Sequence, residues 1–193
     1  MQNLDVDNGI TILDHLIEYL SQIDAIDDIV LGISEGIVNA DFIDFAENRG
    51  IDYIIGDEGD VLSRLISCGK KADATDILRM SSESPFPYLV PLNQSWENHV
   101  SGNYDATFLD EVIDGCGFEI ISMDALEKSH KHGGDNHRSE FCTLFIRENK
   151  EDFLISYVSP PNDLIRRDLR LTIDNPEDLV LERSIYQQFN HQV

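Results

Sequence analysis

The sequence predicts an α/β fold with a mainly parallel sheet, and two patterns along the chain indicate it. Short apolar runs suited to buried parallel strands alternate with longer segments whose apolar residues recur at helical spacing. The first 81 residues contain three such pairs of helix and strand. This alternation is typical of βαβ units with right-handed crossovers. Because 193 residues suffice for a substantial core, we expect residues 1–193 to form a single domain.

The elements of the first half follow from these patterns. Helices are predicted over residues 10–23, 40–50 and 60–72, and strands over residues 27–34, 51–57 and 75–81. Gly50 is suited to the C-cap of the second helix, and Asp60 lies near the start of the third. Three prolines fall within residues 81–91, so this segment is predicted to be a loop or a short turn into a helix.

The second half is less regular. We predict a strand turning into a helix over residues 119–131, a loop over residues 132–137, and strands over residues 153–159 and 169–173. After the last strand, Asp174 or Asn175 can cap a helix, and Pro176 fits its first position. Asp174 is therefore expected at the carboxyl end of a strand, which is the edge where open α/β sheets bind ligands.

Charge and composition exclude several classes of protein. A net charge of -23 argues against a surface that neutralises nucleic acid phosphates. The three cysteines are scattered without CxxC spacing, which fits a reducing cytoplasm and argues against a zinc ribbon. No segment has the pattern of a membrane span or a signal peptide. We therefore expect a cytoplasmic protein that binds neither nucleic acid nor membrane.

The acidic excess is concentrated in the first third of the chain. Residues 1–63 contain fifteen Asp and Glu residues against one basic residue, Arg49. An anionic ligand would therefore find its charge partners in the later part of the chain or in a metal ion.

Two acidic residues, Glu83 and Asp174, each follow a predicted strand. Two carboxylates that meet at one sheet edge can hold Mg²⁺, which takes its remaining ligands from water and phosphate. The alternative is that both residues cap helices, as acidic residues at strand ends often do.

Other reactive side chains give weaker signals. His130, His132 and His137 lie in or beside a Gly-containing loop, but their spacing matches no known metal-ligand pattern, so solvated histidines are favoured. Cys142 lies in an apolar run, which favours a buried core residue over a nucleophile. No GxGxxG, GxxxxGK[ST] or GxSxG sequence occurs, so a Walker-type phosphate loop and a hydrolase elbow are unsupported.

Five segments, taken together, match the motifs of one family. RLTIDNPEDL at residues 170–179 is similar to R-[WL]-T-[VL]-D-x-P-E-D-L, and GDEGDVLSRL at residues 56–65 to G-x-x-x-D-V-L-x-R. The others are LRMSSESPF at residues 78–86, DGCGFEIISMDALEKSH at residues 114–130 and SEFCTLFI at residues 139–146. In this order they resemble the cytidylyltransferases of the spore-coat polysaccharide type, relatives of CMP-3-deoxy-manno-octulosonate synthetase.

The resemblance implies a Rossmann-like nucleotidyltransferase fold, a three-layer sandwich. It also implies a Mg²⁺ ion, held by Glu83 and Asp174, that activates CTP for attack by an acidic sugar or a sugar phosphate. The family has Asp where this chain has Glu83, so the charge is kept and the reach is longer. No catalytic residue is assigned. By position, the residues implied to bind nucleotide or substrate are Arg79, Ser81, Ser82, Glu119 and Glu140.

The match also departs from the family. Family members open with a strand and the loop A-R-x-x-S-x-R-L-P-G-K around the triphosphate, whereas residues 1–20 resemble the next family segment, L-x-G-K-P-L-L-x-H-x-I-x-x-L. The fold is therefore expected to be N-terminally truncated, without a central strand. Ser139 replaces an Arg, Phe141 a His and Gly117 an Asp of the family motifs.

These departures predict a degenerate protein of nucleotide-sugar or surface polysaccharide metabolism, weak or inactive as an enzyme. Such a protein would bind a nucleotide or an acidic sugar, or scaffold a partner. The alternative is an active Mg²⁺-dependent cytidylyltransferase that forms a CMP-activated sugar from CTP and releases pyrophosphate. Unpaired sheet edges left by an absent strand would favour a homo-oligomer or a hetero-complex.

Overall fold

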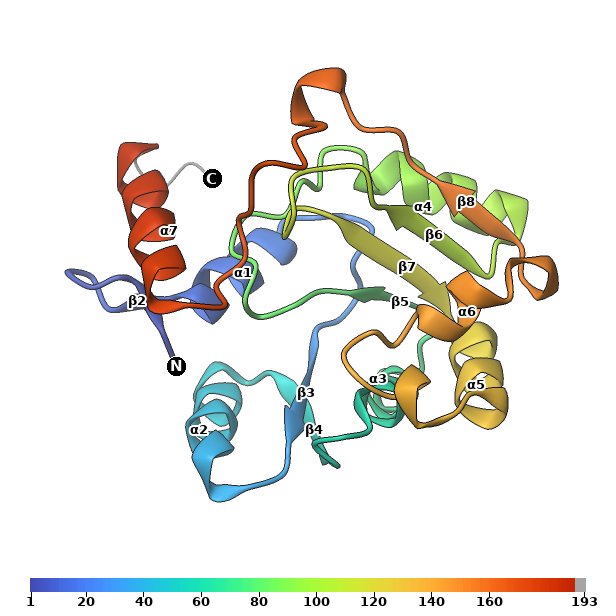
Figure 1. Cartoon of the computed structure of the whole chain (residues 1–193). Helices are drawn as coiled ribbons and strands as arrows, with labels where there is room; N and C mark the ends of the chain where they lie inside the picture. Colours follow the sequence, from blue (N-terminus) through green and yellow to red (C-terminus); the bar gives the residue numbers. More distant parts are fainter. Residues whose placement is uncertain (190–193) are drawn as a thin grey trace.

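The computed structural model describes residues 1–189, whose strands form three separate sheets (Figure 1). β1 (Asn3–Asp5) and β2 (Ile10–Thr11) form a hairpin, and β3 (Val30–Ser34) pairs in parallel with β4 (Asp52–Gly56). The third sheet has the order β5-β7-β6-β8. Its strands are β5 (Asp76–Arg79), β6 (Ala106–Leu109), β7 (Phe118–Ser122) and β8 (Ile155–Tyr157).

The α/β class is confirmed, although the four-stranded sheet is mixed rather than mainly parallel. β7 runs antiparallel to both β5 and β6, and β8 runs parallel to β6. The reason is the short connection between β6 and β7, residues 110–117, which contains no crossover helix. Strands joined in this way pair antiparallel, because a parallel pair needs a crossover of about a dozen residues or more.

Most predicted helices are confirmed, with small shifts at their ends. Gly50 caps α2 in the left-handed conformation at φ 65°, as expected for a glycine at this position. The hairpin, β6, α6 and the bounds of α4 were not predicted. Within residues 1–189 the helices are α1 (Ile12–Leu20), α2 (Ala40–Arg49), α3 (Val61–Lys71), α4 (Leu92–Gly102), α5 (Met123–His132), α6 (Leu144–Glu148) and α7 (Pro176–Gln188). None of the helices within this range is long and apolar enough to cross a lipid bilayer.

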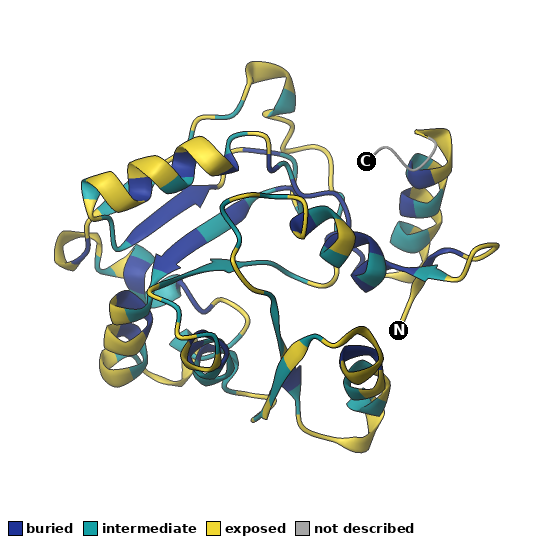
Figure 2. Ribbon diagram, turned by 180° about the vertical axis from the view of Figure 1, so that it is seen from behind, coloured by how far each residue is buried: buried dark blue, intermediate teal, exposed yellow. Residues whose placement is uncertain are grey.

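The four-stranded sheet is covered on both faces, because successive side chains of a strand point to opposite sides. Phe108 of β6 and Ile121 of β7 pack against α3, α5 and α6, whereas Leu109 and Ile120 pack against residues of α1 and α4. Figure 2 shows β6 buried beneath α4. The helices on the two faces give this sheet the expected three layers.

The predicted strand over residues 169–173 is wrong. Arg170 forms only an isolated parallel bridge with Asp114, and Leu171 N donates to the Asp114 carbonyl at 2.7 Å. The partner segment is the irregular connection between β6 and β7, so the pairing cannot extend into a ladder. Its turn at Gly115 has φ 89°, and a Cβ there would lie 2.6 Å from the Leu171 carbonyl oxygen, so only glycine fits.

α7 then begins as the sequence predicts, with Asn175 rather than Asp174 at the N-cap. Pro176 occupies the first turn, and Asn175 N donates to Asp178 Oδ2 at 2.8 Å. Asp174 therefore lies outside the cap.

Asp60 connects the start of α3 to α5. Its Oδ1 accepts a hydrogen bond from Ser63 N at 2.8 Å, and its Oδ2 lies 2.9 Å from His130 Nε2. Partial burial raises the pKa of Asp60, but the bonds from His130 and Ser63 outweigh burial, so the pKa lies below its ordinary value. A depressed pKa means that Asp60 stabilises the fold above its ordinary pKa and that this contribution is lost as the pH falls through the folded pKa.

Asp60→Ala is expected to lower the free energy of unfolding by about 1–2 kcal/mol at pH 7, because the cap of α3 is lost. Asp60→Asn is the matched control, since Asn is an equally good cap and loses only the charge facing His130. Urea denaturation at pH 7 and pH 3 measures both effects, and the Ala variant should lose less at pH 3. Equal destabilisation by Ala and Asn would show that capping contributes nothing.

Candidate functional site

Arg79, the last residue of β5, contacts two other predicted site residues, Glu119 and Glu140. Glu119 of β7 lies opposite Arg79 in the antiparallel register. Arg79 Nη1 lies 3.3 Å from Glu119 Oε2, and Arg79 Nη2 donates to the Glu140 backbone carbonyl at 3.0 Å. Burial lowers the pKa of Arg79, but the charge and hydrogen bond of Glu119 help to raise it above its ordinary value. Arg79 is therefore a cation whose donors are engaged by the protein itself.

Glu119 is the centre of a larger set of charged groups. Its Oε1 accepts from Thr143 Oγ1 at 2.7 Å and from Arg147 Nη2 at 2.9 Å. Arg147 also forms two bonds to Asp110, of 2.6 and 2.9 Å, and its guanidinium lies 3.8 Å from the centre of the Phe108 ring. Burial lowers the pKa of Arg147, but Asp110 and Glu119 outweigh it and hold the pKa well above its ordinary value. We call this set the charge network: Arg79, Asp110, Glu119, Thr143 and Arg147.

Three members of the charge network, Asp110, Thr143 and Arg147, were not predicted as site residues, although Thr143 lies within the family-like segment at residues 139–146. Asp110 directly follows β6, so the rule that selected Glu83 and Asp174 would have selected Asp110 if β6 had been predicted. Arg147 lies one helical turn after Thr143, and its Nε donates to Thr143 Oγ1 at 3.1 Å. Arg147 could have been predicted from its i, i+4 spacing to Thr143, which lies in a family-like segment.

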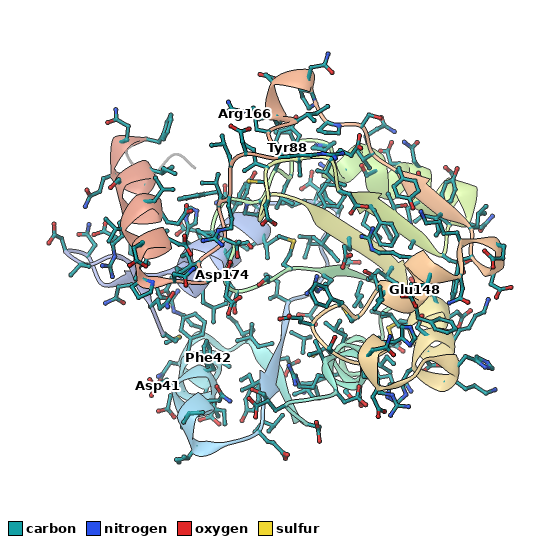
Figure 3. The ribbon with its side chains drawn as sticks, in the orientation of Figure 1. Asp41, Phe42, Tyr88, Glu148, Arg166 and Asp174 are labelled. Carbon is teal, nitrogen blue, oxygen red and sulfur yellow. The ribbon has the colours of Figure 1, made fainter. Side chains whose placement is uncertain are left out.

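The two predicted metal ligands, Glu83 and Asp174, lie on neighbouring backbone segments and are not part of the charge network. Ile173 N donates to the Glu83 carbonyl at 2.9 Å, which fixes the two backbone segments together. Partial burial raises the pKa of Glu83, and the charges of Asp174 and then Glu140 raise it further. The cap prediction is thus wrong for both residues: neither Glu83 nor Asp174 is the N-cap of a helix within residues 1–189. Figure 3 shows Asp174 beside the start of α7.

Asp174 has a cationic neighbour, Arg170. Arg170 Nη1 lies 3.2 Å from Asp174 Oδ2, and Arg170 Nη2 donates to Asp178 Oδ1 at 2.5 Å. A cation that bound Asp174 would therefore compete with Arg170, which can remain paired with Asp178.

The predicted serines have different positions. Ser81 Oγ accepts from Glu83 N at 3.3 Å and so stabilises the turn that presents Glu83, whereas Ser82 is exposed. Within residues 1–189, neither serine is hydrogen-bonded to the charge network.

The remaining reactive side chains have structural roles in the part of the chain described. His130 lies against Asp60, and His137 Nε2 lies 2.9 Å from Glu148 Oε2. Residues 1–189 contain no cluster of three or more His, Cys, Asp or Glu side chains arranged as metal ligands. Cys142 is fully buried, and burial raises the pKa of its thiol to about 11, which confirms it as a core residue.

Comparison with solved structures defines the class of fold. A cytidylyltransferase from Leptospira borgpetersenii superposes with a TM-score of 0.84 at 22% identity, covering 93% of this chain and 77% of that one. The chain therefore has the expected Rossmann-like fold of a nucleotidyltransferase.

Curated relatives make the resemblance more specific. The spore coat polysaccharide biosynthesis protein SpsF of Bacillus subtilis is 25% identical over 72% of this chain, which spans 59% of SpsF, less than two thirds of its length. The uncharacterized protein MJ1063 of Methanocaldococcus jannaschii is 28% identical over 93% of this chain and 74% of its own length. No family model matches the chain. The chain resembles the cytidylyltransferases of the spore-coat polysaccharide type, as its motifs predict.

Proposed function

We propose that this chain binds CTP or an acidic sugar in nucleotide-sugar or surface polysaccharide metabolism, and that Glu83 and Asp174 hold Mg²⁺ for the bound nucleotide. The observation that carries this proposal is the backbone hydrogen bond from Ile173 N to the Glu83 carbonyl, which holds Glu83 beside the residue that precedes Asp174. It is supported by the resemblance to SpsF and by the match of the surrounding motifs.

The two carboxylates suit a divalent cation. The pKa of Glu83 is raised by burial and then by the charges of Asp174 and Glu140. The negative charges of these three carboxylates therefore repel one another, and a bound cation would relieve this repulsion. Mg²⁺ needs only one or two protein carboxylates when phosphates and water complete its shell. When bound, it would neutralise charge on the triphosphate. Asp174 would exchange its contact with Arg170 for the ion, and Arg170 would remain paired with Asp178.

The proposed protein is a weak or inactive transferase when it acts alone. Nucleotidyl transfer needs cations aimed at the phosphates, and such fixed charges are usually the largest contribution to catalysis. Arg79 and Arg147 are engaged by Glu119 and Asp110, and residues 1–63 contain a single basic residue. Few unpaired basic side chains are therefore available to neutralise the triphosphate of CTP.

A second candidate is the active Mg²⁺-dependent cytidylyltransferase, which joins CTP to an acidic sugar and releases pyrophosphate. The close superposition on a cytidylyltransferase favours it, because 93% of this chain shares that fold. An assay of pyrophosphate release with candidate acidic sugars separates the two candidates, since the favoured one predicts little or no release above background by residues 1–193 alone.

Isothermal titration with CTP, with Mg²⁺ or with a chelator, tests the metal site. We expect binding that depends on Mg²⁺, and we expect Asp174→Asn to weaken it by roughly tenfold or more, since one of two carboxylate ligands is removed. The matched control is Asp168→Asn, because Asp168 is also paired with an arginine but lies exposed in a turn earlier in the same connection to α7. Equal CTP affinity with and without Mg²⁺, or an unchanged affinity in Asp174→Asn, would reject the site.

A further inference from the structure

A groove lies between α4 and the edge strand β8, on the face of the four-stranded sheet opposite the charge network. Successive side chains of a strand point to opposite faces, so Thr107 and its β8 partner Ser156 face α4, whereas Phe108 faces Arg147. Figure 2 shows α4 covering β6, the strand next to β8. Beside α4, the small side chains of the edge strand leave a space of about 240 Å³ open.

The lining of this groove is polar but carries no charge. Its polar side chains are Gln94, Ser95, Asn98, Thr107, Ser156 and Ser159. Residues 84–96 and 153–162, which supply much of the lining, contain no charged residue, although 26% of the chain is charged. Glu97 of α4 accepts from Gln94 Nε2 at 3.3 Å but does not line the groove. A ligand with a net charge would therefore find no counter-ion in the groove.

Thr107 ends a buried chain of hydrogen bonds at the groove. Thr107 is 1% exposed and bonds to His99, which is 2% exposed and lies 3.1 Å from Asp76 Oδ1 through its Nε2. Burial raises the pKa of Asp76, but the bonds from His99 and Thr75 outweigh burial and hold the pKa below its ordinary value. An ionised carboxylate only accepts, so Nε2 donates to Asp76, and Nδ1 of the neutral ring accepts from the Thr107 hydroxyl. The lone pairs of that hydroxyl are then left for a ligand that donates.

The other polar groups of the lining leave both donors and acceptors for a ligand. Ser95 Oγ donates to the Pro91 carbonyl at 2.8 Å, so its oxygen can still accept. Within residues 1–189, the hydroxyls of Ser156 and Ser159 have no hydrogen-bond partner and can do both. The hydroxyl groups of a sugar also donate and accept, so a sugar ring matches this mixture. The groove is smaller than the roughly 300 Å³ at which sites for drug-sized ligands begin, which suits a single ring.

We propose that this groove binds one neutral hexopyranose ring, held by hydroxyl and amide groups of α4, β6 and β8. The proposal does not depend on the proposed function, because neither Glu83 nor Asp174 lines the groove. The ring and a nucleotide would therefore bind the chain independently.

Two-dimensional NMR of the isotope-labelled full chain, titrated with D-glucose, D-galactose and D-mannose, tests the site. We expect at least one of these hexoses to shift the backbone amide signals of Asn98, Ser156 and Ser159, with a millimolar Kd. D-Glucuronate and D-glucosamine are the charged controls, and they should bind roughly tenfold more weakly or worse, because their charge would be desolvated without a partner. Methyl glycosides of the same hexoses distinguish a sugar residue of a glycan, which they mimic, from a free reducing sugar.

Two sets of variants test the groove itself. Ser156→Val fills the space and removes a hydroxyl at a strand position that favours Val, so it should abolish the shifts. Ser101→Val is the matched control, because Ser101 is an exposed serine of α4 that does not line the groove. Thr107→Val should weaken hexose binding by roughly threefold to tenfold through the loss of one hydrogen bond, whereas Thr107→Ser keeps the hydroxyl and the affinity.

Three outcomes would overturn the proposal: no shift in the groove with any of the three hexoses, equal affinity for the charged sugars, or equal affinity in Ser156→Val and wild type. Asp174→Asn should leave the hexose shifts unchanged even where it weakens CTP binding. If Asp174→Asn instead abolishes the hexose shifts, the sugar binds at the proposed metal site and the assignment to the groove is wrong.

Discussion

Glu182→Gln is expected to raise the free energy of unfolding by about 3 kcal/mol at pH 8, as judged from the conversion of 1.36 kcal/mol per pKa unit. Glu182 of α7 is fully buried, and among the described residues neither of its carboxylate oxygens has a hydrogen-bond partner. Burial, and then the charge of Asp178, raises the pKa of Glu182 to about 7 from an ordinary value of 4.5. An isosteric neutral amide removes the cost of ionising this buried group.

The pH dependence gives the sign of the effect. Below pH 4.5 the carboxyl is protonated in both the folded and the unfolded chain, so it adds no pH-dependent cost. Between pH 4.5 and pH 7 the unfolded chain loses this proton first, so the stability of the wild-type protein falls as the pH rises. Above pH 7 the cost is constant. The difference between Glu182→Gln and wild type should therefore grow from near zero at pH 4.5 to its full value at pH 8.

Urea denaturation at a series of pH values measures this difference. Glu177→Gln is the matched control, because Glu177 is an exposed residue of the same helix and should show no such trend between pH 4.5 and pH 7. If Glu182→Gln and wild type keep the same pH profile, then Glu182 is not held protonated by burial.

The helices and strands that the sequence predicts best are those with a clear apolar pattern. α3 and β3 carry apolar residues at the spacing of their element, so their approximate limits could be predicted. α4 could not be, because its buried face includes Ser95 and His99. His99 Nδ1 lies 2.8 Å from Thr107 Oγ1, and its Nε2 lies 3.1 Å from Asp76 Oδ1. These hydrogen-bond partners, which are adjacent only in the folded chain, allow a polar side chain to be buried.

The direction of β7 was also predicted wrongly, because an apolar pattern does not specify whether a strand pairs in parallel or antiparallel. The apolar run at β7 is compatible with burial on both faces in either direction of pairing. Only the eight-residue connection after β6 decides that β7 runs antiparallel, and β6 itself is a strand of four residues that the sequence does not set apart.

The candidate site also contains residues that the sequence predicts and residues that it does not. Motif positions led to Arg79, Glu119 and Glu140, and the structure brings these together, although their role in binding stays a prediction. Asp110 and Arg147 come from different elements, and their pairing depends on how α6 lies across the end of the four-stranded sheet. Such a contact carries no periodic signal in the sequence, so tertiary structure was needed to find it.

Glu119→Ala is expected to lower the free energy of unfolding by about 3 kcal/mol, because it leaves two partly buried arginines without their shared carboxylate. Glu119 is 13% exposed and accepts from Arg79, Thr143 and Arg147. The matched control is Glu111→Ala, which removes an exposed pair with Arg167 and should cost no more than about 1 kcal/mol. Urea denaturation of both variants at pH 7 measures the difference.

Glu119→Gln separates charge from hydrogen bonding at the same position. The amide keeps the shape and one acceptor oxygen but not the negative charge, so an intermediate loss is expected if the two arginines need a counter-charge. The same variant leaves Arg79 and Arg147 less neutralised, and CTP, as an anion, should then bind more tightly than to wild type. A loss of stability in Glu119→Ala no larger than in Glu111→Ala would mean that the charge network is a surface feature. Weaker CTP binding by a folded Glu119→Gln protein would instead place Glu119 among the groups that contact the ligand.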